Sequence, residues 1–116
     1  MNLLLAAALA LAAPGGISVS VPERVHVDAF IPVEGTVRVE PGERRVVRLE
    51  EVVAGRWYVV ERTRATRSGR YALLERSGFT PQERTFRMVA PRTKRLPRAV
   101  SRVFDVQMYI DVPGTP

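Results

Sequence analysis

Cysteine is absent from the 116-residue chain, which excludes a disulfide framework, a thiolate metal site and a cysteine nucleophile. Lysine occurs once, at Lys94, so the 18 basic residues are otherwise all arginine and the net charge is +6. Such an arginine bias can arise from a GC-rich genome as well as from selection for guanidinium chemistry. The positive charge favours contact with phosphates, anionic polysaccharides or acidic lipid surfaces.

Reactive groups are also scarce. Histidine occurs once, at His26, on the same polar face of a predicted strand as Asp28, yet no serine lies in a G-x-S-x-G elbow. Glu50 and Glu51 are adjacent, so on a strand they point to opposite faces and cannot act on one bond. No glycine-rich phosphate loop is present. The sequence therefore predicts a protein that is not an enzyme, with no catalytic residue, cofactor, metal or small-molecule substrate.

Long apolar runs are limited to residues 1–13, which read MNLLLAAALALAA. This run is too short to cross a bilayer core of about 30 Å as a helix. It suits a secretory signal peptide, with the small residues Ala10 and Ala12 before a cleavage site and Pro14 ending the helix. The segment lacks Lys and Arg, and the alternative is a buried N-terminal helix. We predict a signal-peptide helix over 1–13, a secreted or cell-surface protein, and no membrane span after processing.

Downstream of this run, apolar residues recur at every second position, which is typical of strands with one buried face. The alternation is clear over 17–33 and again over 104–110. Between these stretches, short alternating segments are separated by turn dipeptides such as Pro41-Gly42, Ala54-Gly55 and Ser68-Gly69. About seven strands at this spacing predict an all-β fold. We expect an antiparallel immunoglobulin- or fibronectin-like β-sandwich domain over residues 17–112.

The alternation also predicts which side chains form the core of this domain. Its expected centre consists of Val27, Val37, Leu49, Trp57, Tyr71, Phe86, Phe104 and Val106. Trp57 and Tyr71 are in phase with apolar neighbours, so we interpret them as core residues rather than as a platform for stacking sugars.

The central half of the chain has an order of motifs that can be compared with a known family. The matching positions are Val47 and Leu49, Gly55 and Trp57, Thr63 and Thr66, Gly69 and Tyr71, and then Phe86, Arg87, Met88 and Pro91. In this order they resemble the immunoglobulin-like repeats of exported actinobacterial and other bacterial surface proteins. The resemblance implies a non-catalytic spacer, adhesion or ligand-binding module whose partner is a cell-envelope polymer or a protein.

The chain departs from that family in two respects. The turn Arg67-Ser68-Gly69-Arg70 offers no carboxylate where related turns often carry acids, so calcium binding is not carried over. The family also occurs as tandem repeats, whereas this sequence contains one copy and no internal period.

Basic residues concentrate between the strand around Phe86 and the last strand. The candidate polyanion-binding residues are Arg84, Arg87, Arg92, Lys94, Arg95, Arg98 and Arg102. Pro91 and Pro97 keep the connecting loop extended, and loops at one end of a sandwich are common binding sites. The alternative is a solvated basic loop that keeps the protein soluble.

A second basic group, Arg62, Arg64, Arg67 and Arg70, surrounds the Ser68-Gly69 turn and is interpreted as an exposed strand edge. Three functions remain open at this point. They are a binding or structural module at the cell surface, a polyanion-binding protein (anionic cell-wall polymer or nucleic acid), and a carbohydrate-associated or enzyme-accessory domain whose catalytic partner lies on another chain.

Overall fold

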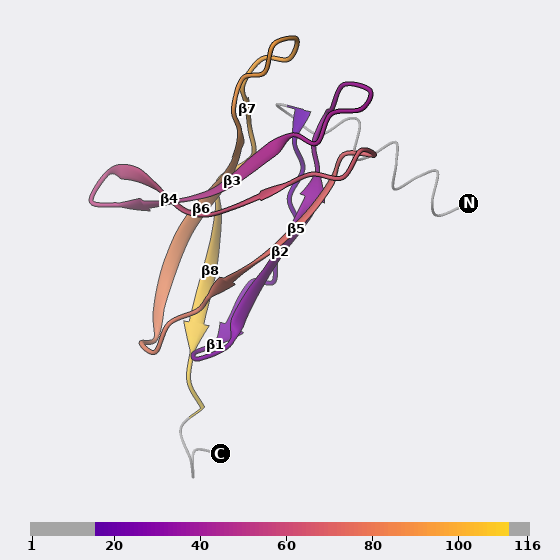
Figure 1. The fold of residues 1–116 in the computed structure, drawn as a ribbon. Helices are drawn as coiled ribbons and strands as arrows, with labels where there is room; N and C mark the ends of the chain where they lie inside the picture. The colour runs from indigo at the N-terminus through magenta and orange to yellow at the C-terminus, as the bar shows by residue number, and fades with distance from the viewer. Residues whose placement is uncertain (1–15, 112–116) are drawn as a thin grey trace.

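The structure is a computed structural model that describes residues 16–111 (Figure 1). The predicted signal peptide over 1–13 lies outside the described residues. The described chain forms eight β strands in two sheets, which confirms the expected all-β class. The strands are β1 (Arg24–His26), β2 (Phe30–Thr36), β3 (Val46–Val53), β4 (Arg56–Arg64), β5 (Arg70–Arg76), β6 (Gln82–Ala90), β7 (Ala99–Val100) and β8 (Phe104–Tyr109).

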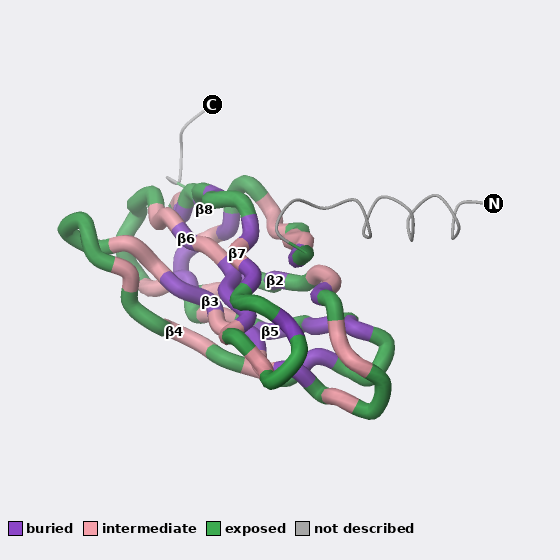
Figure 2. Tube along the Cα trace, turned by 90° about the horizontal axis from the view of Figure 1, so that it is seen from above, coloured by how far each residue is buried: buried purple, intermediate pink, exposed green. Residues whose placement is uncertain are grey.

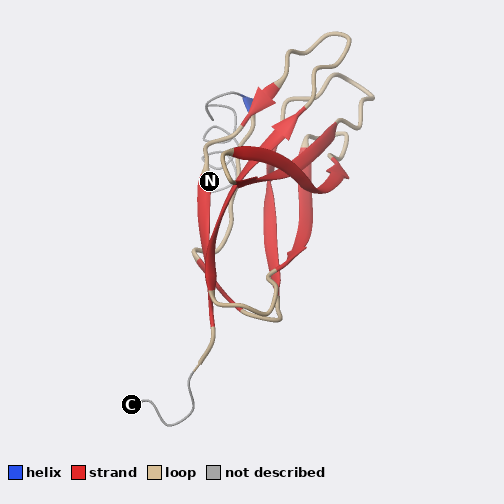
Figure 3. Ribbon diagram, turned by 90° about the vertical axis from the view of Figure 1, so that its left-hand side faces the viewer, coloured by secondary structure: helices blue, strands red, loops and turns tan. Residues whose placement is uncertain are grey.

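The larger sheet has the order β1-β8-β6-β3-β4, with the short β7 paired to β6, and the smaller sheet pairs β2 with β5. All pairings are antiparallel except that of β1 with β8, which is parallel. Several of the loops that connect the strands gather at the upper end of the molecule in Figure 3. Within residues 16–111, no helix is long and apolar enough to cross a membrane.

The first described segment joins the smaller sheet without forming a regular strand. Ile17 bridges to Val37 and Ser20 bridges to Glu34 of β2. The hydroxyl of the buried Tyr71 donates a hydrogen bond to the carbonyl of Ser18, and burial raises the pKa of this phenol. Both groups lie over Gly35, where any larger residue would overlap them. The glycine at position 35 therefore lets the N-terminal segment lie against the sheet.

One hydrophobic core takes buried residues from both sheets, and Figure 2 marks the buried positions along the chain. Phe86 of β6 and Phe104 of β8 stack near its centre, with ring centroids 5.8 Å apart. Seven of the eight predicted central residues are buried, which confirms the period-two pattern for Val27, Val37, Leu49, Tyr71, Phe86, Phe104 and Val106.

The prediction is wrong for Trp57, which is only partly buried and does not belong to the core. The cause is a register shift: Leu49 faces Glu61 whereas Glu50 faces Val59, so Val60 is an extra residue on β4. The extra residue turns Trp57 onto the opposite face of the sheet, where it pairs with Val52. There the Arg87 guanidinium carbon lies 4.2 Å from the Trp57 ring centroid.

Candidate anion-binding groove

The structure separates the candidate cations of the sequence into different environments. Arg84 shares the phase of Phe86 on β6, and its side chain is only 12% exposed. Its Nε and Nη2 donate to the two carboxylate oxygens of Glu51 at 2.9 and 2.8 Å, and Nη2 also reaches Glu75 at 2.7 Å. The hydrogen bonds with Glu51 are the main reason that the pKa of Arg84 is raised. Arg84 thus links β3 and β6 of the larger sheet to β5 of the smaller one.

Arg87 is also engaged with a carboxylate, on the outer face of the larger sheet. Its Nε donates to Glu50 at 2.9 Å, directly across the β3–β6 pair. Glu50 is buried and also contacts Arg48 at 3.3 Å. Glu50 and Glu51 therefore serve different arginines on opposite faces of β3, as their adjacency predicts.

The remaining candidate residues lie in or near the 91–98 loop but do not form one patch. Lys94 and Arg95 line a hollow of about 350 Å³ together with Glu40 and Glu43, whose carboxylates oppose their charge. Arg98 is exposed. Arg102 is exposed, and its guanidinium carbon lies 5.5 Å from the ring centroid of Phe104.

The 91–98 loop is fixed by an arginine that the sequence pattern did not indicate. Arg45 is 3% exposed, and its guanidinium donates hydrogen bonds to the carbonyls of Arg38 at 2.9 Å, Pro91 at 3.2 Å and Pro97 at 2.6 Å. Burial lowers the pKa of Arg45, yet a guanidinium remains charged. No described carboxylate lies within ion-pair distance of it. Arg45 therefore holds two loops together, and the charge of Glu43 acts on it only from beyond ion-pair distance.

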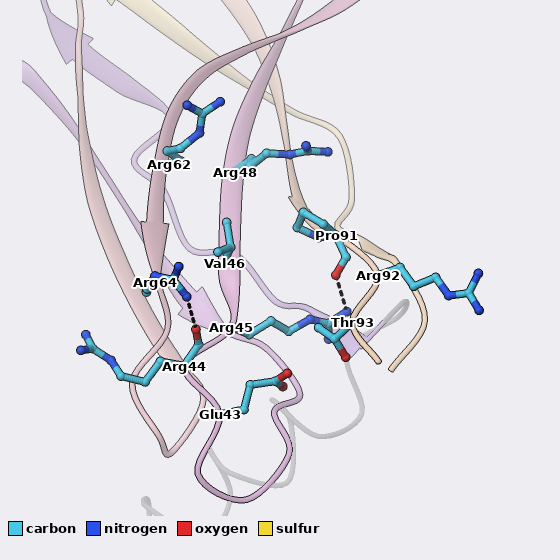
Figure 4. A pocket seen from close by; sticks show the side chains of 10 residues that line it. All are labelled: Glu43, Arg44, Arg45, Val46, Arg48, Arg62, Arg64, Pro91, Arg92 and Thr93. Carbon is cyan, nitrogen blue, oxygen red and sulfur yellow. Dashed lines mark hydrogen bonds between the residues drawn. The ribbon is translucent and has the colours of Figure 1, made fainter. Parts of the chain in front are cut away.

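Next to Arg45, a groove of about 490 Å³ opens between β3, β4 and the start of the 91–98 loop (Figure 4). We call it the basic groove. Its lining includes six arginines and one acid, Glu43. The arginines are Arg44, Arg45, Arg48, Arg62, Arg64 and Arg92. The carboxylate of Glu43 accepts a hydrogen bond from the Glu40 amide and so helps to form the 40–43 turn.

Strand register brings these cations together. Arg48 of β3 lies directly opposite Arg62 of β4, and Val46 lies opposite Arg64. Residues facing each other on one side of an antiparallel pair are close neighbours, so a facing pair of like charges destabilises the sheet. Arg64 is held in place because its Nη1 donates to the carbonyl of Arg44 at 3.1 Å. Glu50 balances the charge of Arg48, whereas no described carboxylate lies within ion-pair distance of Arg62.

The groove combines residues that sequence reasoning assigned to different groups. Arg92 comes from the predicted loop, Arg62 and Arg64 come from the group interpreted as an exposed edge, and Arg44 and Arg48 were not singled out. The available signal was the alternation of Arg44, Val46 and Arg48, which places Arg44, just before β3, on the same side of the chain as Arg48 of β3. The arginines of β4 can be assigned to the same groove only when the pairing of β4 with β3 is known.

The single histidine of the chain lies outside the groove. The Nδ1–H of His26 donates to the carbonyl of Val27 at 2.8 Å, and its Nε2 lies 3.9 Å from a carboxylate oxygen of Asp111. Asp28 has φ 60° in the turn after β1, so the predicted face shared with His26 ends there. Within residues 16–111, no group of three His, Cys, Asp or Glu side chains is arranged to hold a metal ion.

No protein-family model, no curated protein and no solved structure matches this chain. We therefore infer the function of the chain from the geometry of the basic groove and from the strand topology.

Proposed function

We propose that the described domain is an immunoglobulin-like β-sandwich. Two features of the strand order support the proposal. The sequence β8-β6-β3-β4 corresponds to the G-F-C-C′ order of that fold, and the β2–β5 pair corresponds to its B and E strands. Two departures are that the tryptophan lies on β4 instead of the central β3, and that Phe86 and Phe104 occupy the centre where antibody domains have a disulfide.

In this arrangement the loops at one end of the sandwich are the expected binding loops. The 40–44 loop and the 91–98 loop lie at the same end of the molecule, drawn uppermost in Figure 1. Both border the basic groove through Arg44 and Arg92. The groove therefore lies where this fold commonly binds its ligands.

The function that the geometry supports best is non-catalytic binding of an anionic polymer by an exported module at the cell surface. The observation that carries this function is the basic groove itself, because six of its ten lining residues are arginines and one is an acid. Clustered guanidinium groups bind phosphate, sulfate and carboxylate groups strongly and with a fixed geometry. Export follows from the expected signal peptide, and the N-terminal residue of the mature protein tests it.

Binding is tested with the full chain, using heparin and inorganic polyphosphate as probes at low salt. Arg62→Gln combined with Arg64→Gln removes two charges from the groove, and we expect the dissociation constant to rise at least about tenfold in isothermal titration calorimetry. The matched control is Arg56→Gln with Arg67→Gln, which removes two exposed charges beside the same strand, outside the groove. We expect its affinity to change less than about twofold.

A third variant separates the groove from the loop predicted by sequence. Arg95→Gln with Arg98→Gln removes two cations of that loop that do not line the groove. Equal losses in all three variants would mean that only the net charge matters, and unchanged affinity in the groove variant would refute the proposed function.

A further inference from the structure

We propose that the ligand of the basic groove is a chain of phosphodiester groups joined by short carbon spacers and carrying no bases, such as a polyol phosphate. This inference rests on the proposed function and names the ligand of the same site. It follows from the spacing of the arginines, the residues between them and the lack of aromatic side chains in the groove.

Several guanidinium groups of the groove are free to bind a ligand. Arg44, Arg62 and Arg92 form no ion pair or side-chain hydrogen bond with any residue of 16–111. Arg64 uses one nitrogen on the Arg44 carbonyl and keeps its other donors, whereas Arg48 contacts Glu50 through Nη2. Each free guanidinium can hold a phosphate through two parallel hydrogen bonds.

The distance between the arginines along β4 indicates how far apart the bound phosphates lie. Arg62 and Arg64 lie two residues apart on β4, and successive residues on one face of a strand are about 7 Å apart. This distance matches the separation of neighbouring phosphates in an extended phosphodiester chain. One phosphate then lies between Arg62 and Arg48, where it relieves the repulsion of this facing pair. The next phosphate lies beside Arg64 and Arg44.

The surface between the charges is partly apolar. Val46 lies opposite Arg64 in the strand register, and Pro91 forms part of the opposite wall (Figure 4). These apolar groups suit carbon spacers between the phosphates. Inorganic polyphosphate has no carbon spacers, and its phosphates do not have the separation that matches Arg62 and Arg64. It therefore fits the groove less well than a chain with carbon spacers.

Nucleobases have no stacking partner in the groove. None of the residues that line it is aromatic, although single-stranded nucleic acids are bound by stacking bases on aromatic side chains. Trp57 lies on the same sheet, but the guanidinium of Arg87 covers its ring at 4.2 Å. The groove therefore recognises the phosphate chain alone.

The charge of Arg45 contributes to the electrostatic potential inside the groove. Arg45 contributes a buried positive charge that has no carboxylate partner, and its Nε has no hydrogen-bond partner in the described structure. A buried charge is screened less by salt than an exposed one. Arg45 thus raises the positive potential at the floor of the groove, against which the phosphates lie.

The test uses the full chain and glycerol phosphate oligomers with one to six phosphates. Because a second phosphate binds within the same molecule, we expect affinity to rise at least about tenfold from one phosphate to three and then level off. The slope of log K against log salt should be about −1.4 for two bound phosphates, and Arg62→Gln should reduce its magnitude by about 0.7. The matched variant Arg56→Gln should leave the slope unchanged.

Three probes of equal phosphate number complete the experiment: the glycerol phosphate oligomer, inorganic polyphosphate and single-stranded oligodeoxythymidine. The glycerol phosphate oligomer should bind at least about fivefold more tightly than either of the others. Equal or tighter binding of oligodeoxythymidine or polyphosphate, or no dependence on length, would overturn this inference. If heparin binding still depends on Arg62 and Arg64, the proposed function survives that result. If heparin binding does not depend on them, the proposed function fails as well.

Discussion

Arginines occur in two contrasting regions of this molecule, one between the two sheets and one in the basic groove. Inside, Arg84 contacts two carboxylates, Glu51 and Glu75, at distances below 3 Å. In the groove, Arg62 faces another arginine, Arg48, across the strand pair. Arginine therefore stabilises the fold at position 84, whereas at position 62 its charge is repelled by a neighbouring arginine.

The difference lies in the opposite charge that the chain itself supplies. The interior cations have their partners within the fold, so they are not available to a ligand. The groove cations have few partners, so an external anion can stabilise them. This comparison explains why net charge and local density of arginine in the sequence do not locate a binding site.

The largest effect should come from breaking the interior network. Arg84→Met leaves Glu51 and Glu75, whose side chains are 15% and 12% exposed, without a cation, and we expect the free energy of unfolding to fall by about 3 kcal/mol. Urea denaturation measures the loss. Adding Glu51→Gln and Glu75→Gln should restore part of it, because no uncompensated charge then remains. A loss below about 1 kcal/mol for Arg84→Met would show that the network does not contribute as a buried ion pair.

A smaller effect is expected at the arginine between the two regions. Arg45→Met leaves the carbonyls of Arg38, Pro91 and Pro97 without their donor, so we expect a loss of about 1–3 kcal/mol and faster amide hydrogen exchange in residues 91–98. Its exposed neighbour Arg44 provides the matched control: Arg44→Met should change stability by less than about 0.5 kcal/mol. Equal exchange rates in the two variants would contradict the role of Arg45 in fixing the loop.

The smallest change in the free energy of unfolding is expected in the groove, where we expect a gain instead of a loss. Arg62→Gln removes the repulsion with Arg48, so the ligand-free protein should keep its stability or gain up to about 0.5 kcal/mol. Thermal unfolding at low and high salt measures this change, which should disappear as salt screens the repulsion. A loss of more than about 1 kcal/mol would mean that Arg62 supports the fold and would remove the contrast between the two regions.

Much of the fold could be predicted because period-two alternation reports the buried face of each strand directly. The inward position of Arg84 could also be predicted, because Arg84 alternates in phase with Phe86 and Met88 on β6. It was instead grouped with the cations of the 91–98 loop because it lies near them in the sequence. The outward position of Trp57 could not be predicted, because it depends on the extra residue Val60 in β4. The basic groove depends on the pairing of β3 with β4 and on loop positions, which alternation does not specify.

The parallel pairing of β1 with β8 has a mechanical consequence. The chain enters β1 at Arg24 and leaves β8 at Tyr109, and these residues lie at opposite ends of the paired stretch. A pulling force applied between Gly16 and Asp111 would therefore slide the two strands lengthwise, loading their hydrogen bonds together instead of opening them one by one. A module anchored at one end and attached to a polymer would resist tension through this pair of strands.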